Sequence, residues 1–342
     1  MRKNHILLLS ILLLMACTGT KQSKEPAVDI LPDKVVIAYV TSWSDIMPDP
    51  TYLTHINYAF GHVNDSFDGV RIDNEDRLRQ LVALKKDAPH LQILLSIGGW
   101  GSGRFSEMAE NTDFRERFAK DCQRVVNAFD LDGIDIDWEY PTADYAKISA
   151  SPKDTENYTL LMRDIRKAIG DQKLLTQATV ATAEYIDFKA VEPYMSFTNV
   201  MSYDMGNPPY LNSGLYRSEH VDKICTDEAI RAHLNAGIPP HKLVMGLPFY
   251  GRGIKDFPRP DDLTKVHLME GYTAQWDDVA KVPYLTDADG NLVYGYENLE
   301  SLAIKCEYAL EHGLLGAMYW SYSGDNEAGD LRRTVYETLN KK

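Results

Sequence analysis

The chain has 342 residues and a formal net charge of −14 at pH 7. This charge argues against nucleic acid as a partner, because DNA and RNA phosphates would be repelled. The length is enough for one α/β barrel, which typically has about 250 residues and more with insertions. We therefore expect one acidic globular domain that does not bind nucleic acid.

The first residues have the pattern of an export signal. Two basic residues precede an apolar run at 6–16, which is shorter than the roughly 20 residues of a membrane-spanning helix. The run ends in Leu14-Met15-Ala16-Cys17, which resembles a bacterial lipobox, where the cysteine is lipidated and becomes the mature N-terminus. We expect a lipoprotein signal peptide at 1–17, with a plain signal peptide as the alternative.

The segment at 18–32 is small, polar and charged, and it is expected to be a tether. With Cys17 acylated, the protein would be anchored in the cell envelope by lipid and not by a transmembrane helix. Whether the periplasmic or the outer face carries it stays open at this point. The folded domain is expected at 33–342.

From residue 33 on, short apolar runs alternate with segments of helical periodicity, as in a parallel sheet with crossover helices. The expected strands are 35–41, 55–60, 92–97, one within 131–141, 174–181, 198–203, 242–248 and 315–320. The expected helices are 75–86, 114–129, 155–169, 227–235, 299–312 and 326–339. Eight such strands predict a (β/α)8 barrel, the TIM-barrel fold.

One segment, 251–296, interrupts this alternation between the seventh and eighth strands. It has room for a hairpin or two, one of them around Asp289-Gly290-Asn291. We therefore expect a small insertion at this point.

Three cysteines follow Cys17 in the chain. Cys122 and Cys306 fall on apolar faces of expected helices, and Cys225 makes the number odd. Buried thiols are therefore favoured over a disulfide framework.

The most informative stretch is Leu131-Asp-Gly-Ile-Asp-Ile-Asp-Trp-Glu-Tyr-Pro141. In a strand, side chains alternate between faces, so Asp135, Asp137 and Glu139 share one face, about 6.6 Å apart along the chain. Their mutual repulsion and burial should keep a proton on at least one acid near neutral pH, as a general acid requires. Glu139, at the carboxyl end, is the candidate. A calcium-binding loop is the alternative, but the interleaved apolar residues favour a strand.

The pattern Asp132-x-x-Asp135-x-Asp137-x-Glu139 followed by Tyr140-Pro141 resembles the signature of family 18 glycoside hydrolases, the chitinase family. The resemblance implies a (β/α)8 barrel with Glu139 as proton donor. Many members of that family carry an α+β insertion domain between strands seven and eight, so the resemblance implies that the insertion at 251–296 is shortened and the cleft shallower and more open. It also implies that the substrate's own 2-acetamido oxygen is the nucleophile, because this family is an exception to the two-carboxylate mechanism.

The same resemblance gives roles to the residues around Glu139. Asp137 would orient the acetamide, Tyr203 would donate to its oxygen, and Asp135 would share a proton with Asp137. Asp132 is expected to brace the loop. No metal ion and no cofactor is expected.

Further motifs at strand ends match the family and imply a substrate-binding set. Trp100 in Ser96-Ile-Gly-Gly-Trp100 would face a sugar on the leaving-group side, with a core tryptophan as the alternative. Trp320 would form the floor under the reacting sugar, by stacking on it. The other expected members are Met201, Asp204, Tyr39, Phe60 and Arg252, with core packing open for Tyr39 and Phe60 and a surface role open for Arg252.

The resemblance implies endo-acting cleavage of β-1,4-linked N-acetylglucosamine, in chitin or its oligosaccharides. One alternative is an endo-β-N-acetylglucosaminidase acting on the chitobiose core of N-glycans. An alternative of another class is a non-catalytic chitin-binding lectin, which Glu139 disfavours, because such lectins typically lack this acid.

Overall fold

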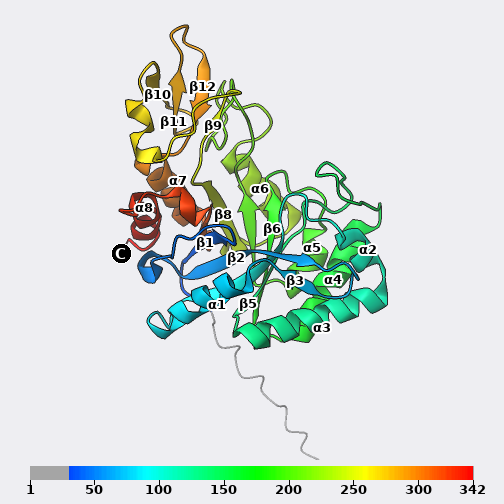
Figure 1. Ribbon diagram of the computed structural model, residues 1–342. Helices are drawn as coiled ribbons and strands as arrows, with labels where there is room; N and C mark the ends of the chain where they lie inside the picture. The colour runs from blue at the N-terminus through cyan, green and yellow to red at the C-terminus, as the bar shows by residue number, and fades with distance from the viewer. Residues whose placement is uncertain (1–30, 342) are drawn as a thin grey trace, which may run out of the picture. The chain divides into compact units, whose positions relative to one another are not determined.

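Parallel strands close into a barrel in the computed structural model, which describes residues 31–341 (Figure 1). The barrel strands are β1 (Val35–Thr41), β2 (His55–Val63), β4 (Gln92–Gly98), β5 (Gly133–Asp137), β6 (Leu174–Val180), β7 (Phe197–Met201), β8 (Leu243–Pro248) and β13 (Gly316–Trp320). They are hydrogen-bonded in the order β1-β13-β8-β7-β6-β5-β4-β2, and β1 pairs with β2 to close the ring. The predicted (β/α)8 barrel is confirmed. Cys17 and the signal peptide lie outside the described residues.

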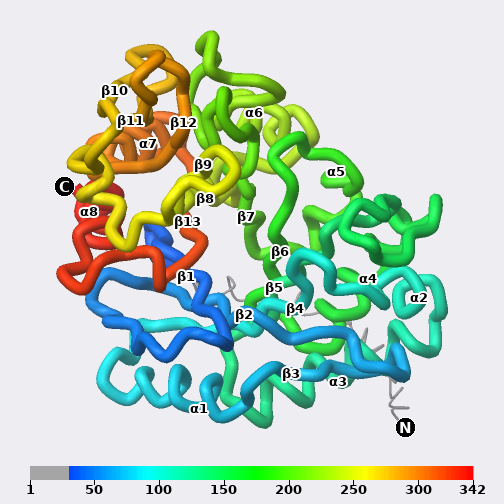
Figure 2. The backbone as a smooth tube through the Cα atoms, turned by 45° about the horizontal axis from the view of Figure 1, so that its top comes forward, coloured from blue at the N-terminus to red at the C-terminus, as the bar shows by residue number. Residues whose placement is uncertain are grey.

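Helices follow most barrel strands and cover the outside of the ring, as the tube in Figure 2 shows. The α-helices are α1 (Glu75–Ala83), α2 (Phe105–Glu110), α3 (Thr112–Phe129), α4 (Asp154–Ile169), α5 (Phe188–Val191), α6 (Thr226–Ala236), α7 (Leu299–Glu311) and α8 (Asp330–Leu339). The 3-10 helices are η1 (Pro50–Tyr52), η2 (Leu84–Lys86), η3 (Glu192–Tyr194), η4 (Pro240–Lys242), η5 (Leu263–Leu268) and η6 (Tyr322–Gly324).

The ends of α3 illustrate how the sequence sets these elements. Asn111 accepts hydrogen bonds from the backbone N–H groups of Asp113 and Phe114 at 2.9 and 3.1 Å, so the first turn is capped. Asp130 adopts the left-handed conformation with φ 55° and ends the helix. The next residue, Leu131, leads directly into β5, which places the acidic strand beside β4.

Two elements of this half of the barrel differ from the expectation. β2 continues three residues beyond the expected end and pairs with an antiparallel strand, β3 (Val70–Ile72). The short α2 was not expected at all, because six residues give too few turns for a recognisable period. Both follow the carboxyl ends of barrel strands, β2 and β4.

The insertion between β8 and β13 forms an antiparallel sheet in the order β10-β11-β12-β9, labelled at the top of Figure 1. Its strands are β9 (Arg252–Gly253), β10 (Thr273–Asp277), β11 (Val282–Thr286) and β12 (Leu292–Gly295). A hairpin joins β11 to β12, and Asp287 accepts hydrogen bonds from the backbone N–H groups of Asp289 and Asn291 in its turn.

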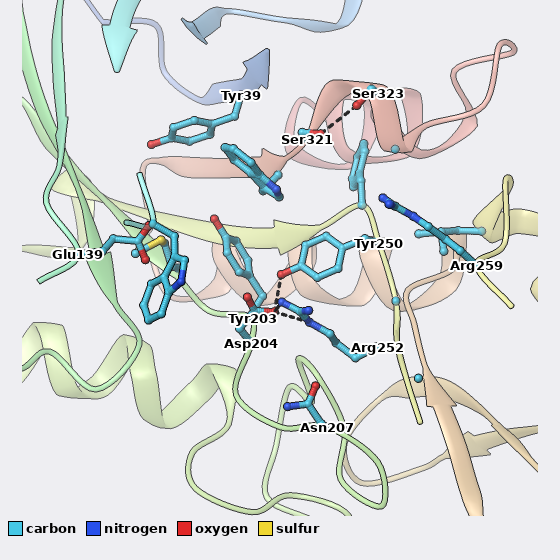
Figure 3. A pocket seen from close by; sticks show the side chains of 18 of the residues that line it. Tyr39, Glu139, Tyr203, Asp204, Asn207, Tyr250, Arg252, Arg259, Ser321 and Ser323 are labelled. Atoms are coloured by element: carbon cyan, nitrogen blue, oxygen red, sulfur yellow. Dashed lines mark hydrogen bonds and ion pairs between the residues drawn. The ribbon is translucent and has the colours of Figure 1, made fainter. Parts of the chain in front are cut away.

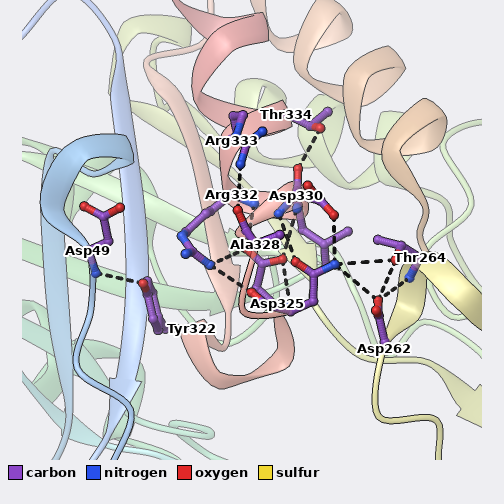
Figure 4. Close-up of polar contacts among 12 residues, drawn as sticks. Asp49, Asp262, Thr264, Tyr322, Asp325, Ala328, Asp330, Arg332, Arg333 and Thr334 are labelled. Carbon is purple, nitrogen blue, oxygen red and sulfur yellow. Dashed lines mark hydrogen bonds and ion pairs between the residues drawn. The ribbon is translucent and has the colours of Figure 1, made fainter.

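Polar contacts join this insertion to the segment after β13 (Figure 4). Asp262, which caps η5, and Thr264 both lie within 3.5 Å of the amide nitrogen of Asn326. Asp325 in turn accepts from the Arg332 guanidinium at 2.9 Å. The base of the insertion is therefore fixed to the chain that follows the last barrel strand.

Within the described part of the chain, Cys122, Cys225 and Cys306 are all buried and form no disulfide, as expected for buried thiols. Among residues 31–341, no helix is long and apolar enough to cross a membrane.

Candidate active site

The carboxylates predicted from the acidic stretch lie at β5 and just beyond its end. Asp135 is 0% exposed and Asp137 4%, while Ile134, Ile136 and Trp138 pack into the hydrophobic core on the other side. The strand approaches β4 very closely here. A Cβ on Gly98 would lie 1.9 Å from the Asp137 carbonyl oxygen, so only glycine fits at that position.

Asp135 lies beneath the cleft and accepts hydrogen bonds from four side chains. The donors are Tyr39 Oη at 2.9 Å, Ser96 Oγ at 2.8 Å, Thr176 Oγ1 at 2.6 Å and Asn199 Nδ2 at 3.3 Å. Burial raises the pKa of Asp135, and these four hydrogen bonds oppose the rise because they stabilise the anion. Tyr39 therefore belongs to the support of this carboxylate as well as to the core.

Asp137 has a different environment although it is only two residues away. Its Oδ1 is buried and has no hydrogen-bond partner among the described residues. Burial, and then the negative charges of Glu139 and Asp135, raise the pKa of Asp137 well above its ordinary value. An unsatisfied buried oxygen of this kind is expensive in a folded protein, and a donor from a ligand would satisfy it.

Glu139 points into the cleft from the loop after β5 (Figure 3). Its Oε2 accepts a hydrogen bond of 2.9 Å from the hydroxyl of Tyr140. Burial raises the pKa of Glu139 to about 7; the Tyr140 hydrogen bond lowers it and the charge of Asp204 raises it. A carboxyl group with a pKa near 7 carries a proton that it can donate at neutral pH.

The cleft above these acids has a volume of about 1310 Å³. All the predicted site residues line it except Asp135, which is buried beneath it, and Cys17, which is not described. Trp320 is the centre of an aromatic floor. It stacks on Phe60 with ring centroids 5.7 Å apart at 20°, and Tyr39 lies at the same distance at 50°.

Further lining residues of the cleft come from the end of β7, from the segment after it and from the chain after β8. Asp204 accepts hydrogen bonds from Tyr250 Oη at 2.7 Å and Arg252 Nε at 2.9 Å, as the dashed lines in Figure 3 show. Arg252 is therefore paired with an acid in this structure. Tyr203 lies beside Tyr250, and burial raises the pKa of its hydroxyl well above the ordinary value, so it is a neutral donor.

Trp100 is 64% exposed and lines the cleft, so it is not the core tryptophan of the alternative interpretation. The loop that carries it is tied to β2 and β3. Ser102 Oγ lies 2.8 Å from His62 Nδ1, and His62 Nε2 lies 2.9 Å from Asp73.

Asp132 lies at the opposite end of β5, away from the cleft. It accepts from Lys85 Nζ at 3.0 Å and from the backbone N–H of Ile93 at 2.7 Å. This is the bracing role expected for it.

Some cleft residues were not predicted. Trp43 and Tyr145 are 68% and 67% exposed, and Tyr185 and Tyr250 also line the cleft. Loops have no periodicity that would reveal such residues. The one available signal was an aromatic side chain in the loop after a barrel strand.

Among the described residues, no group of three or more His, Cys, Asp or Glu side chains is arranged to hold a metal ion.

Comparison with known proteins agrees with this geometry. Residues 35–325 match the model of the glycosyl hydrolases family 18. Chitinase A1 of Niallia circulans is 27% identical over 95% of this chain, which spans 61% of that protein's length. Probable chitinase 2 of Drosophila melanogaster is 28% identical, with 97% of this chain and 81% of that protein covered.

A solved structure of a family 18 N-acetylglucosaminidase from Paenibacillus barengoltzii is 33% identical to this chain. It superposes with a TM-score of 0.82 over 90% of this chain and 100% of the other. The chain therefore belongs to family 18 of the glycosyl hydrolases and is a chitinase-type glycosidase.

Proposed function

We propose that this protein hydrolyses β-1,4-linked N-acetylglucosamine in chitin or chito-oligosaccharides, with retention of configuration. Two neighbouring groups carry the proposal. The Oδ1 of Asp137 has no hydrogen-bond partner within residues 31–341, and the carboxyl group of Glu139 has a pKa of about 7. The N–H of a bound acetamide can donate a hydrogen bond to Asp137 Oδ1. The glycosidic oxygen can take the proton of Glu139.

In the first step, Glu139 protonates the leaving oxygen while the acetamido oxygen of the bound sugar attacks the anomeric carbon. The bond to the leaving oxygen breaks, and a cyclic oxazolinium ion forms. Asp137 accepts a hydrogen bond from the N–H of the acetamide and so orients it, and it stabilises the positive charge that develops on the acetamide as the ring closes. Tyr203 donates to the acetamide oxygen and holds it toward the ring.

In the second step, ionised Glu139 takes a proton from water, whose oxygen attacks the anomeric carbon and reopens the oxazolinium ring. Two inversions at that carbon give net retention. Glu139 is then protonated again, so the cycle closes. Proton sharing between Asp137 and Asp135 would need a rotation of Asp137, because no hydrogen bond joins the two carboxyl groups in the present arrangement.

The aromatic surfaces supply the binding energy for this chemistry. Trp320 forms the plate under the reacting sugar, and the exposed ring of Trp100 receives the leaving-group side. Phe60 and Met201 complete the apolar wall.

Partly deacetylated chitin tests the mechanism directly. If the acetamido oxygen is the nucleophile, every new reducing end should be N-acetylated and should appear first as the β-anomer. Proton NMR of freshly released products measures both. New reducing ends with free glucosamine, or products released as the α-anomer, would contradict the proposal.

Product analysis also separates the alternatives. Chitin oligomers of increasing length and an N-glycoprotein should be supplied side by side. Cleavage of the glycoprotein alone would favour action on the chitobiose core, and single N-acetylglucosamine units would indicate an N-acetylglucosaminidase like the Paenibacillus protein. Binding without any cleavage would indicate a lectin.

We also infer that Cys17 is lipidated and that the protein is anchored in the cell envelope. The support is the lipobox-like sequence at the end of the apolar run. Cys17→Ser should abolish metabolic labelling with palmitate, and unchanged labelling would contradict this inference.

A further inference from the structure

The carboxyl group of Glu139 receives one hydrogen bond from the described part of the protein. The Tyr140 hydroxyl donates to Oε2 over 2.9 Å. A neutral carboxyl group accepts best at its carbonyl oxygen and carries its proton on the other oxygen. A donor fixed at Oε2 therefore leaves Oε1 as the oxygen that carries the transferable proton.

Two aromatic neighbours fix the ring of Tyr140. Tyr185 stacks on it with centroids 5.4 Å apart at 16°, and Trp100 meets it at 6.4 Å and 65°. Both arrangements are favourable for aromatic pairs. Because the ring cannot turn freely, its hydroxyl stays directed at Glu139.

Tyr185 is in turn held by an unusual backbone. Its φ is 71°, and that of Ala183 in the same loop is 57°. A bulky non-glycine residue rarely has a positive φ, and such strain persists only where the surroundings enforce it, often at functional sites. Thr155 in α4 supplies part of that enforcement, because its Oγ1 donates to the Tyr185 carbonyl oxygen over 2.8 Å.

We propose that Tyr140 is a positioning residue for the general acid, and that Tyr185 acts through it. Tyr140 selects the oxygen of Glu139 that holds the proton, and the Tyr185 stack keeps Tyr140 in place. This inference rests on the proposed role of Glu139 as proton donor.

The hydrogen bond from Tyr140 also stabilises the ionised form of Glu139, whereas the neighbouring acidic groups destabilise that form. The groups that face Glu139 are Asp137 from β5, Tyr203 and Asp204 from the segment just after β7, and Tyr140 itself. Arg252 is paired with Asp204. Of these interactions, only the Tyr140 bond lowers the pKa of Glu139. Its loss should therefore raise that pKa.

The test is Tyr140→Phe in the full chain, assayed on chito-oligosaccharides from about pH 5 to pH 9. The alkaline limb of kcat/KM reports the pKa of the acid in the free enzyme. We expect this limb to move to higher pH by about one unit, because the free energy of a hydrogen bond to a charged group corresponds to a pKa shift of about that size. At the optimum, kcat should fall by no more than about tenfold, because Glu139 remains.

Tyr185 gives two matched variants. Tyr185→Leu removes the stack and should move the limb in the same direction. Tyr185→Phe keeps the stack and should leave the limb in place. In the double variant Tyr140→Phe/Tyr185→Leu, the alkaline limb should lie at the same pH as in Tyr140→Phe alone, because both substitutions act through the same hydrogen bond.

Several outcomes would overturn the inference. If Tyr140→Phe lowers kcat/KM equally at every pH, the tyrosine has a purely structural role. If it raises KM and leaves the limb in place, the hydroxyl is a sugar contact. Thermal melting of each variant excludes misfolding as the cause. An inactive wild type, or a Glu139→Gln variant with wild-type turnover, would instead refute the proposed function.

Discussion

Carboxylates are buried at two places in this protein. At one place a cation pairs with the buried carboxylate, and at the other place no cation does. Glu297, beside α7, is 0% exposed, and its carboxylate is paired with Lys305, which is 1% exposed. Ser213 and Ser301 also donate to it. At β5, by contrast, none of the described lysine or arginine side chains forms an ion pair with Asp135, Asp137 or Glu139.

The contrast shows which buried charges serve the fold and which serve chemistry. Around Glu297 the cost of desolvation is offset by a cation and by hydrogen bonds, and the cluster joins Ser213, in the segment after β7, to α7. At β5 no cation offsets the desolvation of the carboxylates, and the pKa values of Asp137 and Glu139 are raised as a result. Perturbed groups of this kind are typical of active sites.

The sharpest test of the contrast is Glu139→Gln, which keeps the shape of the side chain and removes its proton. We expect kcat to fall by about 10²- to 10⁴-fold or more, the usual contribution of a positioned acid. Oligosaccharide binding should persist, as isothermal titration can measure.

The control for this variant is Glu327→Gln, at an exposed position that does not line the cleft, which should have wild-type kcat. If Glu139→Gln turned over substrate at nearly the wild-type rate, the carboxylates at β5 would not be the ones that serve chemistry, and the distinction from Glu297 would be refuted.

Lys305→Met tests the paired cluster. The variant leaves Glu297 buried without its cation, which typically destabilises a protein by about 3–5 kcal/mol. Denaturant unfolding measures the loss. Because the cluster is not part of the cleft, kcat below the melting temperature should change little.

The double variant Glu297→Met/Lys305→Met removes both charges and should recover much of the stability. If Lys305→Met and the double variant were equally unstable, the unpaired charge would not be the cause, and packing around Lys305 would be.

The sequence predicted the barrel because its strands and helices follow from local patterns, and it predicted most of the cleft because motifs at the strand ends resemble those of family 18. The alternation around Ile134, Ile136 and Trp138 identifies β5 and its polar face at once. The strand ends then place Trp320 and Tyr203 at one edge of the barrel without any knowledge of distances.

What the sequence did not predict depends on contacts between distant segments. The four donors to Asp135 come from β1, β4, β6 and β7, and only the closed barrel brings them together. The stack of Tyr185 on Tyr140 depends on a loop with an unusual backbone, and no propensity signals that conformation. The pairing of Arg252 with Asp204 likewise needed the structure, since the sequence left both a substrate contact and a surface role open for Arg252.

A last and smaller effect concerns stability and pH. The pKa of Glu139 rises from 4.5 to about 7 on folding, so between these values the folded state keeps a proton that the unfolded state has released. Stability should therefore fall as pH rises from about 4.5 to 7. Glutamine at this position does not titrate, and Glu139→Gln should be more stable than wild type at pH 7 by about 1–3 kcal/mol.

Denaturant unfolding at a series of pH values measures this difference. Below about pH 4.5 both states of the wild type are protonated at this site, so the two proteins should converge there. The slope of the variant should be shallower but not zero, because the pKa of Asp137 is raised as well. If the two proteins were equally stable at pH 7, the burial of Glu139 would carry no energetic penalty. The contrast with the neutralised Glu297 cluster would then rest on geometry alone.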